Sequence, residues 1–257
     1  MHRRPKFYAL GGYTGRYSMA STLLIRHAQA SFGTYDYDRL SDLGYIQAAI
    51  SAEYLAATWG PIARVICGRL KRQAATAEQI TARVRNATDD RPDLMVDPRL
   101  DELEIDACIE RLSPRIPDVN GEFHRLLNEV RTSTRSYQKV MRRVFTEWQQ
   151  LKTFAGAESW PEFSARAATV LQDITRLAGP GETTVVVTSG ALIAAISRHV
   201  LGLPDESTYA LFEAMHNCSI THLKHSHGRI SLSSFNETGF LAAMGAMRGT
   251  SNLVTYR

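Results

Sequence analysis

Cysteine is scarce in this chain of 257 residues, which contains only Cys67, Cys108 and Cys218. Three is an odd number, and these positions form neither a disulfide framework nor a paired C-x-x-C motif. Free cysteines are typical of a reducing compartment, so we expect a cytoplasmic protein with three inert thiols. Because the histidine spacing fits no zinc pattern, we also predict no metal and no cofactor.

Long apolar runs are missing as well. No stretch approaches the roughly 18 apolar residues that a membrane helix needs, and the N-terminal residues lack the hydrophobic segment of a secretion signal. The 30 Lys and Arg against 26 Asp and Glu leave a net charge of +4, which can attract small anions without requiring a nucleic acid. We therefore expect no membrane and no nucleic-acid partner.

Acidic residues are absent before Asp36, and residues 1–18 are basic, aromatic and rich in glycine. We interpret residues 1–18 as an N-terminal tail. Residues 19–257 contain no Pro/Gly/Ser linker, and the overall 44% hydrophobic and 22% charged content is ordinary for a globular protein. A chain of this length is about the largest that one hydrophobic core supports, so we predict a single domain over residues 19–257.

Short apolar runs alternate with helical patterns along most of this domain. This alternation predicts an open, mostly parallel α/β sheet with helices on both faces. We expect strands at residues 21–27, 64–67, 92–99 and 183–188, helices at residues 41–57, 69–85, 159–178 and 191–201, and a closing hairpin formed by residues 218–224 and 229–235. The helix over residues 69–85 is expected to begin with an exposed basic turn.

The segment from about residue 107 to 155 interrupts the alternation. Pro114 and Pro117 break any helix there, whereas residues 122–154 carry apolar side chains at helical spacing, so we predict a helical cap insertion. Residues 110–152 hold nine Lys/Arg and five Asp/Glu. This excess permits an acidic substrate, but it is also typical of a solvated helical face.

Polar side chains end the first predicted strand, where Leu23-Leu24-Ile25 runs into Arg26-His27-Ala28-Gln29. Open α/β sheets form their ligand sites outside the carboxyl ends of the strands. An arginine there can clamp an oxyanion, and a histidine can attack or transfer protons. These four residues resemble the R-H-G-x signature of the histidine phosphatase superfamily, the phosphoglycerate mutase-like group, with Ala28 in place of the usual glycine.

Three later segments strengthen this resemblance because they follow in the family's order. Residues 67–77 resemble its S-x-L-x-R-x-x-Q-T-A element and include Arg72, Leu100-Asp101-Glu102 resembles its L-x-E acid, and Thr188-Ser189-Gly190 falls where S-H-G is usual. The resemblance covers about residues 20–257, with the helical cap as the variable part. It implies the phosphoglycerate mutase-like fold.

The resemblance also implies roles for individual residues. His27 would attack phosphorus through a neutral ring nitrogen and form a phosphohistidine that water hydrolyses. Arg26 and Arg72 would clamp the phosphate, since planar guanidinium groups bind its oxygens in pairs. Glu102 would protonate the leaving oxygen and later activate water. From the residues alone, the neighbouring carboxylates Asp101, Glu104 and Asp106 remain alternatives for the acid.

Ser189 is the main departure from the family pattern, because a second histidine is usual at this position. Losing one preorganised donor can lower a rate roughly a hundredfold or more. Ser189 could bind a phosphate oxygen, helped by the Gly190 amide and the following helix N-terminus, or it could merely cap that helix. The other histidines follow no predicted strand in the right place, namely His199, His216, His222, His225 and His227.

Together these features predict a phosphomonoester phosphatase that acts on a small phosphorylated substrate, with activity reduced if Ser189 is a poor replacement. One alternative is a phosphoglycerate mutase-type phosphotransferase, although Ala28 and Gln29 depart from the mutase pattern. Another is a catalytically weak module that binds a phospholigand or a protein. The sequence leaves open whether the chain forms a homodimer.

Overall fold

A six-stranded sheet forms the centre of the computed structural model, which describes residues 19–31 and 37–256. The expected tail over residues 1–18 lies outside the described residues. The strand order is β3-β2-β4-β1-β5-β6, in which β3, β2, β4 and β1 are parallel while β5 is antiparallel to both of its neighbours. The strands are β1 (Ala20–Arg26), β2 (Ile62–Cys67), β3 (Asp93–Val96), β4 (Thr183–Thr188), β5 (Ile220–Ser226) and β6 (Arg229–Glu237).

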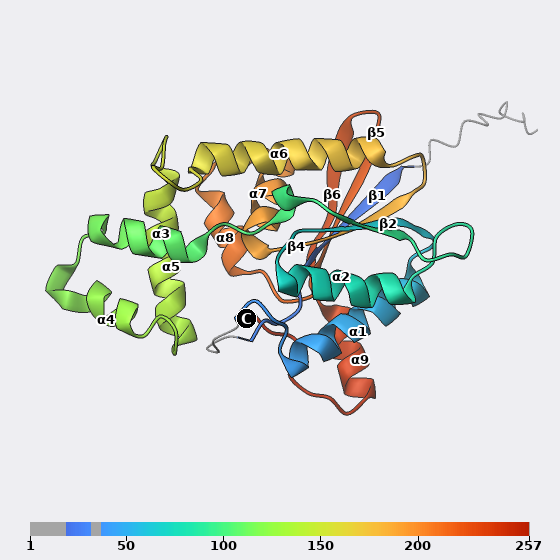
Figure 1. The fold of residues 1–257 in the computed structure, drawn as a ribbon, viewed down its shortest axis with the longest axis horizontal. Coiled ribbons are helices and arrows are strands. Elements are labelled where there is room, and N and C mark those ends of the chain that lie inside the picture. The colour runs from blue at the N-terminus through green and yellow to red at the C-terminus, as the bar shows by residue number, and fades with distance from the viewer. Residues whose placement is uncertain (1–18, 32–36, 257) are drawn as a thin grey trace, which may run out of the picture.

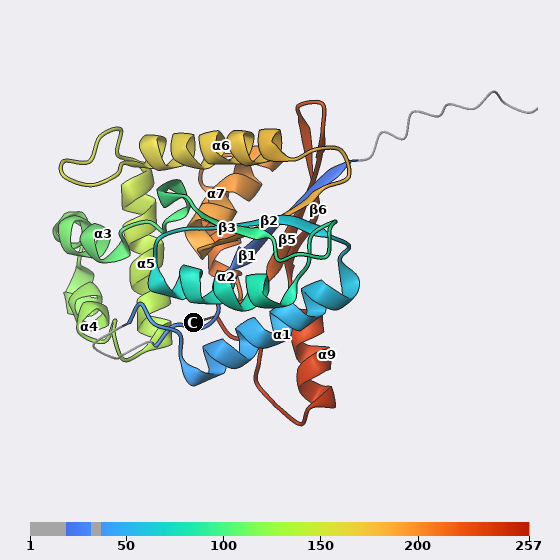
Figure 2. The ribbon, with the colours of Figure 1, turned by 45° about the vertical axis from the view of Figure 1, so that its right-hand side comes forward.

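Helices cover both faces of this sheet, with α1 and α2 on one side and α6 and α7 on the other (Figures 1 and 2). The prediction of an open, mostly parallel α/β sheet is confirmed. Within the described ranges, no helix combines the length and apolar character needed to cross a membrane. The helices are α1 (Asp42–Thr58), α2 (Lys71–Arg83), α3 (Ile105–Leu112), α4 (Glu122–Asn128), α5 (Thr134–Gln149), α6 (Trp160–Leu177), α7 (Gly190–Leu201), α8 (Ser207–Glu213) and α9 (Gly239–Met247).

The apolar run of β1 fits a strand that is buried on both faces. Leu23 and Ile25 pack in the core beneath α1 and α2, whereas Leu24 packs in the core beneath α6 and α7. Successive side chains of a strand point to opposite faces, so a strand covered on both sides is mostly apolar, and the one fully buried hydroxyl of β1, on Thr22, pairs with His225 at 3.0 Å. Arg26 and His27 follow this apolar run, where the strand leaves the core.

The cap consists of α3, α4 and α5, which lie beyond the carboxyl ends of the parallel strands (Figure 1). The predicted helical stretch over residues 122–154 is broken into two helices, and α5 ends at Gln149. The break follows from local capping. Ser133 accepts a hydrogen bond from the Ser136 amide at 3.1 Å, and Glu129 accepts one from the Ser136 hydroxyl at 2.6 Å, so a new helix begins there.

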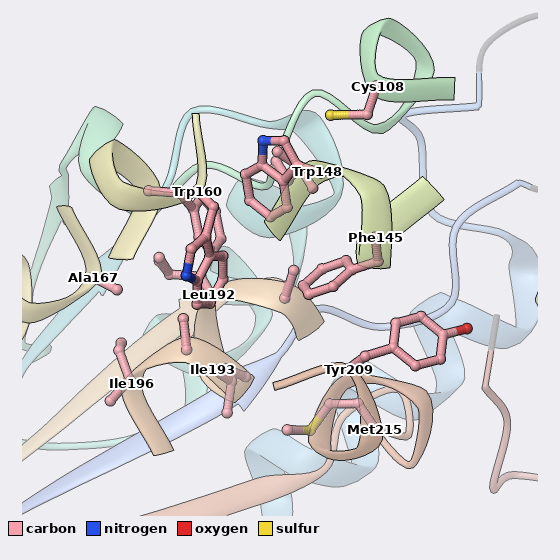
Figure 3. Packing of buried hydrophobic residues seen from close by; sticks show 14 of the residues in the cluster. Cys108, Phe145, Trp148, Trp160, Ala167, Leu192, Ile193, Ile196, Tyr209 and Met215 are labelled. Carbon is pink, nitrogen blue, oxygen red and sulfur yellow. The ribbon is translucent and has the colours of Figure 1, made fainter. Parts of the chain in front are cut away.

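An aromatic cluster joins the cap to the main body (Figure 3). Trp148 of α5 lies 5.4 Å from Trp160 of α6 and 5.2 Å from Phe145, measured between ring centroids. The indole Nε1 of Trp148 donates to the Glu158 carbonyl at 2.9 Å. Because this core continues to Leu192 and Ile193 of α7, the cap is packed in a defined position relative to the strand ends.

Candidate active site

The carboxyl ends of β1, β2 and β4 bring the predicted site residues to one edge of the sheet. Arg26 is in register with Thr188, and the His27 amide donates to the Thr188 carbonyl at 2.8 Å. Parallel neighbours end at the same edge, so the residues after β1 and β4 lie side by side. The segment after β2 leads directly into α2, which carries Arg72.

His27 is held in one orientation. Its Nδ1 lies 2.8 Å from the Ala28 carbonyl oxygen, which can only accept, so this nitrogen carries the proton. The other ring nitrogen, Nε2, therefore has the free electron pair, and it accepts from Arg72 Nε at 3.1 Å. Burial, and then the positive charges of Arg72 and Arg26, hold the pKa of His27 well below its usual value despite the Ala28 contact. The imidazole is thus neutral at pH 7.

Arg72 points inward, whereas Arg69 and Lys71 of the predicted basic first turn are exposed. The helix begins at Lys71 and not at Arg69, because the Asp38 carboxylate accepts from the Lys71 amide at 2.9 Å. The same carboxylate pairs with Arg72 Nη1 at 2.6 Å, and the Tyr37 ring lies 5.5 Å from the guanidinium carbon. These contacts orient the side chain of Arg72, a residue that is 8% exposed.

Arg26 is anchored through one guanidinium nitrogen and has another that is buried and unpaired among the described residues. Nη1 donates to the Met215 carbonyl at 2.5 Å, whereas Nε is buried without a hydrogen-bond partner among the described residues. A Cβ atom at Gly190 would lie 3.5 Å from this Nε and 3.2 Å from the Phe212 ring, so a larger residue there would crowd the guanidinium. Burial lowers the pKa of Arg26, and the charge of Glu102 opposes this effect. The unpaired Nε is suited to an anionic ligand.

Glu102 is the carboxylate that faces the arginines. Its two oxygens accept from the Leu103 amide at 3.1 Å and the Ala191 amide at 3.4 Å. Burial raises the pKa of Glu102, against the lowering effects of Arg72 and Arg26. A carboxyl group with a raised pKa can hold a proton for transfer.

The alternative acids lie elsewhere. Asp101 pairs with Arg69, whose Nε donates at 2.8 Å, and Glu104 and Asp106 are exposed to solvent. Arg166 of α6 fixes the chain just before Glu102, because its Nη1 donates to the carbonyls of Arg99 at 2.6 Å and Asp101 at 3.0 Å.

Ser189 occupies the position before α7, but its side chain caps no backbone amide there. Its Oγ accepts instead from Gln73 Nε2 at 2.8 Å. The reading of Ser189 as a mere helix cap is therefore wrong. The amide of Ala191, at the start of α7, is directed to Glu102.

His216 lies closer to this region than the sequence indicates. It follows α8 directly after Met215, the residue whose carbonyl binds Arg26. Its Nδ1 is 3.1 Å from Asn236 Nδ2, and its ring centroid is 4.2 Å from that of Tyr256. Burial lowers the pKa of His216, as does the charge of Arg26, so a neutral ring stands at the margin of the site.

Three supporting residues escaped the sequence prediction. Asn217 Nδ2 donates to the His27 carbonyl at 3.2 Å, and the Asn217 amide donates to the Thr255 carbonyl at 2.8 Å. Asp38 orients Arg72, and Gln73 binds Ser189. The available signals were weak: Asn217 is a polar residue before a predicted strand, Gln73 sits inside a recognised motif, and Asp38 lies in a loop without periodicity.

Across residues 19–31 and 37–256, no three His, Cys, Asp or Glu side chains converge as metal ligands would. The absence of a metal from the reaction stays a prediction. The groups that do converge are a neutral imidazole, two guanidinium groups and a carboxyl group with a raised pKa. They can bind a dianion, attack it and supply a proton.

The family model described as histidine phosphatase superfamily (branch 1) matches residues 22–153 and 128–238 of this chain. No curated protein matches the chain. Among solved structures, the mycobacterial glucosyl-3-phosphoglycerate phosphatase is similar, with 24% identity and a TM-score of 0.58 over 86% of this chain and 100% of that one.

Phosphoserine phosphatase from Entamoeba histolytica, solved in complex with phosphoserine, is 21% identical, with a TM-score of 0.58 over 87% of this chain and 100% of that one. A protein described as mycobacterial hydrolase 2 is 22% identical, with a TM-score of 0.57 over 91% of this chain and 100% of that one. At these identities the likeness demonstrates a shared fold.

Proposed function

Because this chain belongs to the histidine phosphatase superfamily (branch 1), we propose that it hydrolyses a small phosphomonoester through a phosphohistidine at His27. The observation that carries the proposal is the state of this imidazole. Its proton is held on Nδ1 by Ala28, and its free electron pair on Nε2 faces Arg72. A neutral nucleophile beside a cation is the arrangement that attack on a bound phosphoryl group requires.

In the first step the phosphoryl oxygens bind to Arg26 Nε and Arg72, and the Arg72 contact moves from His27 to the substrate. Nε2 of His27 then forms a bond to phosphorus while the bond from phosphorus to the leaving oxygen breaks. Protonated Glu102 gives its proton to that oxygen, so the product leaves as a neutral alcohol. The raised pKa of Glu102 supports this role.

In the second step the Glu102 carboxylate takes a proton from water, and the water oxygen attacks phosphorus. The bond between phosphorus and His27 breaks, which releases inorganic phosphate and returns the imidazole to its starting state. Ser189 and the Gly190 region lie at the neighbouring strand end and would contact the transferring group. A neutral hydroxyl there stabilises the developing charge less than an imidazolium would, so we expect a slower enzyme than one with two histidines.

Substrate choice is proposed to depend on the cap. The names of the similar structures suggest phosphoserine and a glucosylated phosphoglycerate as test compounds. Several cap arginines form ion pairs on the surface, including Arg115 with Glu147 and Arg143 with Glu122. These pairs favour a solvated helical face over a binding site for an acidic substrate. We propose a cytoplasmic location on the basis of the unpaired cysteines.

The test is phosphate release from p-nitrophenyl phosphate and from a panel of sugar, nucleotide, amino-acid and glycerate phosphates. Wild type is compared with His27→Ala, and the exposed His199→Gln serves as the matched control. We expect release that His27→Ala abolishes and His199→Gln leaves intact. Rapid quenching should trap a phosphoprotein that is labile in acid and stable in base, as a phosphohistidine is.

Two results would overturn the proposal. Transfer of phosphate to a second hydroxyl group without net release would identify a mutase-type phosphotransferase. Tight binding of inorganic phosphate, together with no turnover across the whole panel, would identify a binding module.

A further inference from the structure

Gln73 and Ser189 form a hydrogen-bonded pair at the edge of the candidate site. We propose that Gln73 is a positioning residue: it holds the Ser189 hydroxyl so that its proton is donated to the phosphoryl group, in place of the missing histidine. This inference rests on the proposed hydrolysis at His27. It assigns a role to Gln73 and explains how a serine at position 189 can donate a hydrogen bond to the phosphoryl group.

The direction of the hydrogen bond follows from a third group. The same amide atom of Gln73 lies 2.8 Å from Ser189 Oγ and 3.0 Å from the Leu100 carbonyl oxygen. A carbonyl oxygen can only accept, so this atom is the nitrogen and it donates to both. Ser189 Oγ is therefore the acceptor, and its own proton is left for another partner.

No protein group within the described residues takes that proton. Ser189 is completely buried, and Gln73 is the hydrogen-bond partner of its Oγ in residues 19–31 and 37–256. Its neighbours serve the catalytic groups, since the Thr188 carbonyl binds the His27 amide and the Ala191 amide meets Glu102. A buried donor requires an acceptor, and a phosphoryl oxygen bound between these groups would provide one.

Gln73 also occupies the space that a larger residue at position 189 would need. Its Oε1 is buried without a hydrogen-bond partner, and a Cβ atom on Gly68 would lie only 2.0 Å from it. The amide is thus packed between Gly68 and Ser189 and cannot retreat. In the orientation of the Ser189 side chain, an imidazole ring would overlap the Gln73 amide.

The pair accordingly predicts an unusual result for restoring the family histidine. Ser189→His alone should lower phosphate release, because the ring collides with Gln73. The double variant Gln73→Ala/Ser189→His removes the collision and should be more active than Ser189→His alone. A Ser189→His protein at least as active as wild type would overturn the steric part of the proposal.

A double-mutant cycle on kcat tests the role of the Ser189 hydroxyl. It combines Ser189→Ala with Gln73→Met, in which methionine keeps the length of the glutamine side chain. Ser189→Ala should lower kcat about a hundredfold or more, as removal of a preorganised donor does. Gln73→Met should lower kcat when Ser189 is present and have a smaller effect in the Ser189→Ala background. Ser197→Ala is the matched control, because its hydroxyl is buried in α7 without a partner among the described residues.

Inhibition by vanadate, which mimics the transferring phosphoryl group, distinguishes a hydroxyl positioned for catalysis from one that only supports the fold. Ser189→Ala should weaken inhibition by vanadate by a larger factor than inhibition by inorganic phosphate. Independent, multiplying effects of the two substitutions would overturn the inference, as would a Ser189→Ala enzyme with the kcat of wild type. A different result would contradict the proposed function itself, namely a wild-type protein whose phosphate release does not depend on His27.

Discussion

Nε of Arg72 donates a hydrogen bond to Nε2 of His27 across 3.1 Å. The group expected to bind the phosphoryl oxygens therefore already touches the nitrogen expected to attack phosphorus. Asp38 holds the other side of the guanidinium through Nη1 at 2.6 Å. This chain of contacts places both partners before substrate arrives, which lowers the cost of orienting them in the reaction.

Arg72→Lys should lower kcat/KM about 10- to 100-fold for each charge-assisted hydrogen bond that is lost. A lysine keeps the charge, but it lacks the planar guanidinium group that binds Asp38 through one nitrogen and presents the others to a phosphoryl oxygen. Steady-state kinetics with p-nitrophenyl phosphate measure the effect. The exposed Arg176→Lys is the control, and equal activity of both variants with wild type would contradict the role of Arg72.

The pH profile of kcat/KM should be bell-shaped, with its acid limb at lower pH and its alkaline limb at higher pH than an ordinary histidine and glutamate would give. The pKa of His27 lies well below its usual value of about 6.5, so the neutral nucleophile persists into acid. The pKa of Glu102 lies above its usual value of about 4.3, so the proton donor persists toward higher pH before it is lost. We expect an acid limb below pH 6.5 and a falling alkaline limb.

Glu102→Gln should remove this alkaline limb, because an amide has no proton to lose. If the alkaline limb is unchanged in Glu102→Gln, it arises from another ionisation, such as the second ionisation of the substrate phosphate.

The effect of Glu102→Gln on kcat should also depend on the leaving group. An alkyl phosphate needs a proton on its departing oxygen, and loss of a general acid typically costs about 10²- to 10⁴-fold. p-Nitrophenolate is a weak base that leaves without a proton, so cleavage of its ester should fall much less. Paired measurements on p-nitrophenyl phosphate and glycerol phosphate test this. A uniform loss on both compounds would indicate that Glu102 has no role as an acid.

Asn217→Ala should destabilise the protein and loosen the site. The buried side chain of Asn217 donates to the His27 carbonyl at 3.2 Å and accepts from the Thr255 hydroxyl at 3.0 Å. Removing one partner leaves buried polar groups unpaired, at a cost of about 1–3 kcal/mol each in the free energy of unfolding. Urea unfolding measures this cost. The exposed Asn128→Ala should have no comparable effect.

Much of the fold could be predicted because the relevant signals are local. The run Thr183–Thr188 is buried at every position as β4, and the pattern of short apolar runs and helices was enough for the α/β sheet. The start of α6 is also a local feature, since the Ser159 amide donates to the Glu162 carboxylate at 2.8 Å in a capping box. The extent of the cap helices could not be predicted, because the break before α5 depends on side-chain hydrogen bonds that involve Ser136.

The sequence by itself determined that Arg26, His27, Arg72, Glu102 and Ser189 end or follow elements of one α/β sheet, since parallel strands deliver such residues to a common edge. Only the tertiary structure decided how they meet. Arg72 turns inward because Asp38 binds both its guanidinium and the start of α2, and Ser189 meets Gln73 from another element. Contacts between residues distant in the chain depend on packing, which periodicity and motifs do not encode.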